Sequence, residues 1–414
     1  MVVIGRFLWG YRARIWVRLE LERMSLEIRS YRPEDLGPLT RIGSLAFGQS
    51  VADWEKYYTE NPRIDLDLVY VLEEEGEARA TATVLPLEVF MDGKPAPMGG
   101  VAAVSTHPAY RRRGYAGELM RAALRGMRER KLHLSMLWPF AHVFYRLYGW
   151  ELAGEAISYT LKPSDLPTSS EQKRVRAYVE EDLPQMMALF EEEASGHQCC
   201  VRRGEGQWRE YLGRDKEAIV YEREGRIEGY VLYRMSGWRE DREPPRKLSI
   251  RELAARSVGA REALISFMAA QDPLVFEIKY SMPRGEPIHP FVRSSYIKAE
   301  VEPEFMLRLV DVEGALNFLD LAVDEPFVLE VSDDVIPEND GPYTIGDGEV
   351  ARGAEAGEKV SLDVRQLAQL CAGYLSARQL ARHGLIGASS PEALEVLQAL
   401  FPVDDPWVFP QDHF

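Results

Sequence analysis

The sequence predicts a mixed α/β fold of the α+β kind, divided into several domains. With 414 residues, of which 46% are hydrophobic, the chain is long enough for two or three domains with cores of their own. Strand-like and helix-like segments alternate from Met24, this order restarts after Thr160, and the pattern changes again near Glu304. We therefore expect an N-terminal extension and three domains, over residues 1–23, 24–162, 163–303 and 304–414.

The first predicted domain begins with a strand, a helix and two further strands. Residues 26–31 fit the first strand, and apolar residues recur at helical spacing in the segment that follows. Residues 68–72 and 80–87 are strand candidates separated by a polar turn. Two aromatic residues, Phe47 and Trp54, lie between the helix and these strands.

The turn after the apolar run at residues 101–104 is the most informative part of the chain. It has the spacing Arg-x-x-Gly-x-Ala, from Arg111 through Gly114 to Ala116, and a helix is expected over residues 117–127. A helix start leaves unpaired N–H groups that bind anions, and glycine lets the backbone approach them closely. The spacing is neither that of a Walker loop nor that of a dinucleotide fold. We expect a pyrophosphate site; the alternative is an arginine-rich helix start on a solvated surface.

A second motif follows the next apolar run, at residues 132–137. Trp138-Pro139-Phe140 leads into a short helical stretch that carries Phe144-Tyr145, followed by Gly149-Trp150. One interpretation is an aromatic side chain packed on a half-buried helix, with its hydroxyl bonded to a neighbour. After the arginine turn, a catalytic role for Tyr145 is favoured instead.

Composition narrows the function classes. The net charge of −16 argues against nucleic acid as a partner and favours a cationic small molecule or a peptide amine. Three cysteines cannot form a disulfide framework, and no apolar run has the length of a membrane span, so we expect a soluble, cytoplasmic protein. The histidines and cysteines lack metal-ligand spacing, and we expect no metal.

The first 23 residues interleave arginines with aromatic and aliphatic residues. The arginines interrupt any signal-peptide core. The segment is either a basic amphipathic helix that contacts a membrane surface or a partner, or an extension produced by a translation start upstream of Met24. We assign it no function.

The second predicted domain repeats the order of the first. Residues 175–183 echo residues 28–36, a hairpin is expected over residues 218–233, and a strand at 249–254 leads into a helix at 260–270. No arginine–glycine turn of the required spacing joins that strand and helix. The run that contains Arg203 precedes the hairpin and lacks the first arginine of the pattern, so we interpret this copy as inactive, a scaffold that walls the substrate pocket.

The third predicted domain is α+β and ends in an aromatic-rich tail. The tail is unlike a frayed terminus, and its last residue is Phe414. Strands, an Asp-Gly hairpin and helices are expected, in chain order, at residues 307–312, 327–331, 343–348, 363–374 and 390–400.

The arginine turn and the Phe-Tyr motif resemble the two acyl-CoA signatures of the GNAT superfamily of N-acetyltransferases. The pattern from Met24 to Phe414 as a whole resembles the enhanced intracellular survival (Eis) family, including the segments 330–333 and 345–348 and the terminal phenylalanine. That resemblance implies tandem GNAT folds, the second degenerate, followed by a sterol-carrier-protein-like domain. It also implies a homo-oligomer, a hexamer.

The resemblance further implies acetyl-CoA as co-substrate. The backbone of Val104, Ser105 and Thr106 would bind the pantetheine and polarise the acetyl carbonyl, and Phe140 would belong to the same cofactor site. Phe47, Trp54 and His413 would line the acceptor pocket. The residues implied in holding the pyrophosphate are Arg112, Arg113, Gly114, Tyr115, Ala116 and Gly117.

In the same family pattern, Tyr145 protonates the departing CoA thiolate and the terminal carboxylate of Phe414 is the general base. A primary amine with a pKa of about 10.4 is protonated at neutral pH, so an anion beside it must bind the cation and accept its proton. Burial raises the pKa of a terminal carboxylate and makes it a better base. His413 departs from the pattern and is an alternative base.

The expected function is transfer of an acetyl group from acetyl-CoA to an amine of a cationic acceptor, in a ternary complex. The acceptor would be aminoglycoside-like, a polyamine or a lysine side chain. Two alternatives are open: an acyltransferase with another acyl-CoA or an amino-acid acceptor, and a non-catalytic sensor that binds CoA or lipid.

Overall fold

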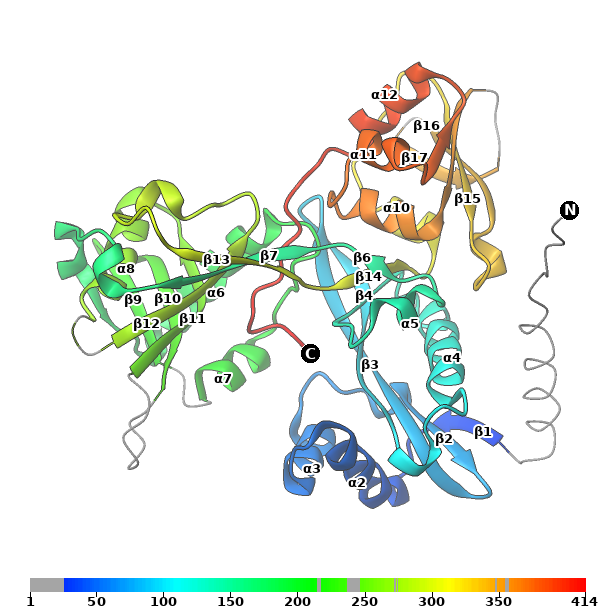
Figure 1. Cartoon of the computed structure of the whole chain (residues 1–414), viewed down its shortest axis with the longest axis horizontal. Helices are drawn as coiled ribbons and strands as arrows, with labels where there is room; N and C mark the ends of the chain where they lie inside the picture. Colours follow the sequence, from blue (N-terminus) through cyan, green and yellow to red (C-terminus); the bar gives the residue numbers. More distant parts are fainter. Residues whose placement is uncertain are drawn as a thin grey trace, which may run out of the picture. The chain divides into compact units, whose positions relative to one another are not determined.

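The computed structural model describes residues 26–213, 217–236, 246–271, 273, 275–346, 348–353 and 357–414. The predicted extension over residues 1–23 lies outside these residues, as does Asp347 of the predicted Asp-Gly turn. The described chain forms two compact units (Figure 1). One contains the described residues up to Pro86 together with Gly100–Arg130, and the other contains the described residues of Leu87–Gly99 and Lys131–Phe414.

The described residues of the first unit form four strands, which lie in the sheet in chain order, and three α-helices. The strands are β1 (Leu26–Ser30), β2 (Val69–Glu74), β3 (Glu77–Met91) and β4 (Lys94–Thr106), the last two of which continue into the second unit. The helices are α2 (Leu36–Phe47), α3 (Val51–Glu60) and α4 (Tyr115–Glu129). The strand–helix–strand–strand order predicted for residues 26–87 is confirmed except that a second helix, α3, which was not predicted, lies between α2 and β2.

Residue alternation along β2 explains how this sheet is covered. Val69 and Val71 are buried in a cluster with Leu39 and with Trp54, from α2 and α3 respectively. Tyr70, between the two valines, points to the other face of the strand and packs against α4 at Gly126. The sheet of this unit therefore has helices on both faces.

The second unit contains three groups of strands. In the first group β4 is followed by β5 (Leu134–Leu137), β14 (Met306–Leu309) and β6 (Glu151–Leu152). The second is a seven-stranded sheet in the order β13 (Lys298–Pro303), β7 (Glu155–Leu161), β12 (Val275–Pro283), β11 (Arg246–Ala255), β10 (Arg226–Met235), β9 (Glu217–Arg223), β8 (Val175–Ala177). The third has the order β17 (Glu349–Arg352), β16 (Gly341–Gly346), β15 (Phe327–Ser332), β18 (Glu358–Asp363), β19 (Ile386–Ala388).

In the described residues of the second unit, eight α-helices accompany these strands. In the described part of the chain, no helix combines the length and apolar character needed to cross a membrane. The helices are α5 (His142–Arg146), α6 (Leu183–Ser195), α7 (Glu205–Gly213), α8 (Val258–Ala269), α9 (Val312–Leu316), α10 (Val364–Cys371), α11 (Ala377–Arg382) and α12 (Pro391–Leu400).

Two segments of the described chain repeat one ion-pair pattern, at the starts of α2 and α6. Arg29 of β1 binds Asp35 at 2.6 Å and also pairs with Glu73 of β2. In the second copy Arg176 of β8 binds Asp182 at 2.7 Å and pairs with a glutamate of β9 at the same distance. The similarity expected between residues 28–36 and 175–183 thus extends to equivalent arginine–aspartate ion pairs.

Strands at the domain borders do not pair with their neighbours in sequence. β7 joins the second sheet, where it pairs with β12 and β13, and β14 pairs with β5 and β6. The strand predicted over residues 307–312 is shorter than expected, because the amides of Val310 and Asp311 both donate to the His133 carbonyl and α9 begins at Val312. The division into 24–162, 163–303 and 304–414 stays a prediction.

Candidate active site

The turn before α4 has the backbone conformation of an anion site. Arg112 and Gly114 both have positive φ angles, of 63° and 88°, and alternation of this kind turns successive N–H groups toward one point. Within the described chain, the amides of residues 111–116 have no hydrogen-bond acceptor, whereas those of Gly117 and Glu118 donate to the Gly114 carbonyl. Six free N–H groups at the start of a 15-residue helix can bind a diphosphate.

Side chains around this turn fix its position on the sheet. The Tyr115 hydroxyl donates to Glu74 of β2, and the Tyr115 side chain is only 4% exposed. Arg113 lies 3.3 Å from the same carboxylate and stacks over the Tyr110 ring at 4.7 Å. The ring of Tyr115 is therefore structural, and its share in the predicted cofactor site comes from its backbone N–H.

The β4 strand carries a local irregularity just before the three residues predicted to bind pantetheine. Ala103 has a φ of 53°, a conformation that costs a residue with a side chain about 1–3 kcal/mol. Ser105 is buried and its hydroxyl has no hydrogen-bond partner in the described chain. Backbone strain of this kind is common at functional sites, and here it lies within β4, directly before Val104.

Tyr145 is a buried residue of helix α5. Its side chain is 3% exposed, and its ring meets the rings of Phe144 and Phe140 at centroid distances of 5.0 and 5.3 Å. Among the described residues no group hydrogen-bonds to the Tyr145 hydroxyl. Burial raises the pKa of Tyr145 above its ordinary value of about 10. The structure thus presents a protonated phenol with its hydrogen free to donate.

The last two residues of the chain lie beside Trp138, and one of them, His413, pairs with Glu304. The Trp138 ring lies 4.5 Å from the His413 ring and 4.8 Å from the Phe414 ring. The Trp138 indole N–H donates to Glu304 at 3.2 Å, and His413 Nε2 lies 3.1 Å from the same carboxylate oxygen. Glu304 was not among the predicted site residues, since nothing near it in the sequence marks it.

Phe47 and Trp54, predicted to wall the acceptor pocket, contact each other in the first unit. Their ring centroids are 5.3 Å apart. Trp54 is 5% exposed, because it packs directly against the Gly43 backbone, and Phe47 is 51% exposed. Of the two, Phe47 has the accessible surface that a ligand contact requires, and the acceptor role of both stays a prediction.

In the second copy, the N-terminus of helix α8 is capped by a side chain, whereas the equivalent N-terminus of α4 in the first copy has no side-chain cap. The Ser257 side chain caps α8 by accepting from the Ala260 amide at 3.2 Å, and its own hydroxyl donates to Glu228 at 2.8 Å. A capped helix start beside a carboxylate repels a phosphate. Residues 256–260 therefore lack both the sequence and the geometry of the turn before α4.

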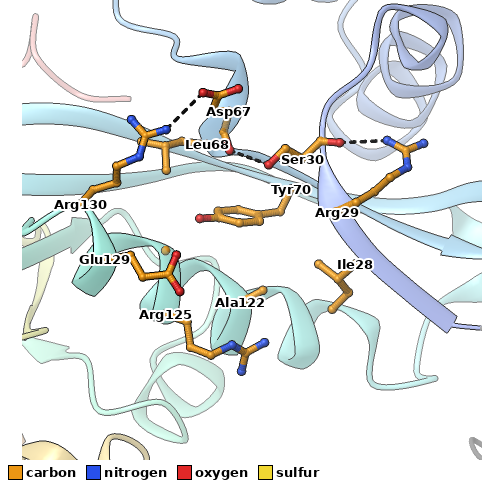
Figure 2. A pocket seen from close by; sticks show the side chains of 11 residues that line it. Ile28, Arg29, Ser30, Asp67, Leu68, Tyr70, Ala122, Arg125, Glu129 and Arg130 are labelled. Atoms are coloured by element: carbon orange, nitrogen blue, oxygen red, sulfur yellow. Dashed lines mark hydrogen bonds and ion pairs between the residues drawn. The ribbon is translucent and has the colours of Figure 1, made fainter.

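An open pocket of about 470 Å³ lies in the first unit, between α4 and the first two strands. Figure 2 shows the side chains that line it. Its lining has mixed charge: Arg130 pairs with Asp67 at 3.2 Å, and Arg125 and Glu129 come from the same helix. None of the residues predicted for the active site lines this pocket.

Within the described residues, Glu193, His197 and Glu286 have potential metal-ligating atoms within 4.8 Å of one another. Glu286 is paired with Arg261 at 3.2 Å, and His197 lies 3.9 Å from Glu193. These ion pairs explain the grouping without a metal, and the expectation of a metal-free site stays a prediction.

Three family models match consecutive parts of the chain. An acetyltransferase (GNAT) domain matches residues 27–153, another acetyltransferase (GNAT) domain matches residues 199–309, and a sterol carrier protein domain matches residues 312–409. The chain is also 25% identical over 336 residues to an uncharacterized N-acetyltransferase of Streptomyces avermitilis, an alignment that covers 76% of this chain and 82% of the relative.

Solved structures share the fold along nearly the whole chain. A GCN5-related N-acetyltransferase from Anabaena variabilis superposes with a TM-score of 0.83 and Eis1 from Mycobacterium abscessus with 0.77. Each is 22% identical in sequence, and each alignment covers 94% of this chain and 100% of the other. The three-part architecture is therefore common to this chain and these proteins.

Proposed function

The chain is an acetyl-CoA-dependent N-acetyltransferase of the GNAT superfamily with an Eis-like succession of domains, and we propose that it acetylates an amine of a cationic acceptor. The acceptor class is a polyamine, an aminoglycoside-like amine or a lysine side chain. The observation that carries this proposal is the meeting of anionic and aromatic groups at the chain end. Glu304 and the terminal residue both contact Trp138, and this combination suits a cation.

In the proposed reaction, the amine nitrogen attacks the thioester carbonyl in a ternary complex. The Phe414 carboxylate accepts a proton from the ammonium group, which frees the nitrogen lone pair. The C–N bond forms and the C–S bond breaks, and the Tyr145 phenol gives its proton to the departing thiolate. The acylated nitrogen then loses its second proton, which restores the Tyr145 phenol, so the net proton released is the one taken up by the Phe414 carboxylate. Backbone N–H groups of Val104–Thr106 would stabilise the developing oxyanion, usually the largest catalytic contribution.

The binding part of the proposal rests on the turn before α4. Its free amides and its arginines suit a pyrophosphate. The residues that would hold it are Arg112, Arg113, Gly114, Tyr115, Ala116 and Gly117. Phe140, 71% exposed beside Tyr145, would contact the cofactor at its reactive end.

Thiol release from acetyl-CoA tests the function directly. The intact chain and a variant lacking Phe414 are compared on polyamines, aminoglycosides and lysine peptides. We expect the truncation to lower kcat by about 10²–10⁴-fold, the usual contribution of a general base, with acetyl-CoA affinity unchanged in calorimetry. Equal turnover by both chains would rule out the terminal carboxylate as the base.

Two further variants separate the carboxylate from its surroundings. A semisynthetic chain ending in Phe414 carboxamide keeps the ring and loses the charge, and we expect it to behave like the truncation. His413→Gln removes the alternative base and should retain most of the turnover. Loss of turnover in His413→Gln, with activity retained in the carboxamide, would transfer the base role to His413.

A further inference from the structure

The C-terminal tail leaves α12 and packs into the second GNAT-like domain. The Trp407 amide donates to the Gln198 carbonyl at 3.1 Å. Trp407 and Phe409 are buried in one cluster with Phe190 and Trp208 of α6 and α7. In Figure 1 the tail ends, at the label C, in the neighbourhood of α7. The degenerate copy therefore holds the segment that carries the terminal residue.

One fully buried arginine holds the end of this tail. Arg203 Nε and Nη2 donate to the two oxygens of Asp412, each at 2.7 Å. The side chains of both residues are 0% exposed. Tyr211 of α7 donates a further hydrogen bond to Asp412 at 3.1 Å. A bidentate pair of this kind fixes both the distance and the orientation of the carboxylate.

Arg203 is itself fixed from the other side. Its Nη1 donates to Glu252 of β11 at 3.0 Å, and the Tyr230 hydroxyl donates to the same Glu252 oxygen at 2.5 Å. The guanidinium also lies 3.9 Å from the centre of the Phe190 ring, a cation–π contact. We name Arg203, Glu252 and Asp412 the tail clamp.

We propose that the tail clamp positions the terminal carboxylate for catalysis, which makes Asp412 a positioning residue and assigns the degenerate GNAT domain the task of holding the general base. The inference rests on the proposed function, in which the Phe414 carboxylate is that base. Only two residues, His413 and Phe414, follow Asp412. An extended chain spans at most about 3.6 Å per residue. Fixing Asp412 therefore confines the carboxylate to a small volume.

Asp412→Asn is the informative substitution. It removes the negative charge of Asp412, while Arg203 keeps its other partner, Glu252. Release of Phe414 from the native enzyme by carboxypeptidase measures how often the tail detaches. We expect release to accelerate on the order of tenfold or more, as for loss of one partner of a buried charge pair. We expect kcat to fall by a similar factor, with the acetyl-CoA dissociation constant unchanged.

Three comparison variants make the result specific. Asp405→Asn loses the same charge in the same tail, outside the clamp, and should leave turnover and Phe414 release as in the parent. Asp412→Glu keeps the charge and should recover part of kcat. A glycine inserted between Asp412 and His413 keeps the clamp but displaces the carboxylate, so kcat should fall although the tail remains attached.

The outcomes distinguish the two levels of the proposal. If Asp412→Asn releases Phe414 and turns over substrate at the rates of the parent, the proposed role of the tail clamp is overturned. Faster release with an unchanged kcat would overturn the positioning role, provided that the chain lacking Phe414 is inactive. If the chain lacking Phe414 retains full turnover, the proposed base is wrong and the positioning role is overturned with it, whatever the Asp412 variants show.

Discussion

Single residues of this protein acquire their chemistry from what surrounds them. Tyr145 would be an ordinary phenol in water, but it is 3% exposed and has no hydrogen-bond partner among the described residues. Burial raises the pKa of Tyr145, because the charged phenolate is disfavoured in an apolar site. A general acid must be protonated to act, so a raised pKa extends its working range to higher pH.

Tyr145→Phe removes the proton donor and keeps the ring. We expect kcat to fall by about 10²-fold or more, the low end for a general acid, with little change in acetyl-CoA affinity, as measured by thiol release and calorimetry. Tyr296→Phe, at a side chain 94% exposed, is the matched control and should behave like the parent. Unchanged kcat in Tyr145→Phe would mean that water or another group protonates the thiolate.

Helices and strands depend on close approach at a few points. On α4, Gly126 faces the Tyr70 ring of β2, and a Cβ built on Gly126 would lie 1.7 Å from the Tyr70 hydroxyl oxygen. Figure 2 shows Tyr70 between the strands and this helix. Helix α4 can therefore approach the sheet this closely only because position 126 has no side chain.

Gly126→Ala should lower stability, although alanine is the better helix former. Overpacking of this kind costs about 1–3 kcal/mol, and urea unfolding measures it. Gly213→Ala at the end of α7 is the control: its Cβ meets nothing within 4 Å, so the variant should be neutral or slightly stabilised. Adding Tyr70→Phe to Gly126→Ala should recover part of the loss. Equal stability of the two glycine variants would contradict the close approach.

The start of α6 depends on an ion pair that predicts acid sensitivity. The Arg176 hydrogen bonds hold the pKa of Asp182 below its ordinary value of 3.8, against the opposing effect of burial. A carboxyl with a lowered folded pKa contributes stability above its unfolded pKa, and that stability is lost as the pH falls through the folded value. Asp182→Asn should cost about 1–2 kcal/mol at pH 7 and flatten the fall in stability below about pH 4. Denaturant unfolding across pH 2–7 measures this; an acid limb as steep as the parent's would contradict it.

At the scale of the whole molecule, the parts of the second unit are connected by strands that pair with strands distant in sequence. β14 pairs with β5 and β6, and its Arg308 donates to Asp333, after β15, at 2.6 Å. Both side chains are 0% exposed. Desolvation lowers the pKa of Arg308, and the Asp333 charge opposes that effect. This buried ion pair thus connects β14 to the segment that follows β15 in the C-terminal domain.

Asp333→Asn leaves the Arg308 charge buried without its partner. Breaking a buried pair from one side costs about 3–5 kcal/mol, so the variant should unfold at a clearly lower urea concentration. Asp334→Asn, the same substitution at the exposed neighbouring position, is the control and should stay near the parent. Matching stability of the two variants would show that Arg308 does not depend on Asp333.

Local patterns made much of this architecture predictable. The Arg-x-x-Gly-x-Ala spacing marks a turn whose free amides the structure confirms, and the repeat of residues 28–36 at 175–183 has the same ion pairs in both copies. The run containing Arg203 was interpreted only as a failed cofactor turn. Its partner Asp412 lies 209 residues away, and no periodicity connects positions so far apart.

The sequence by itself determined the order of the three domains, the arginine–glycine turn before α4 and the Phe-Tyr motif that follows it, because each of these patterns depends on spacing within neighbouring strands, turns or helices. Only the tertiary structure decided that β7 and β14 pair away from their neighbours in sequence, that Trp54 is buried, and that Glu304 contacts the chain end. Those features arise from contacts between distant segments, and such contacts are selected by packing and by pairing of buried charge rather than by local propensity.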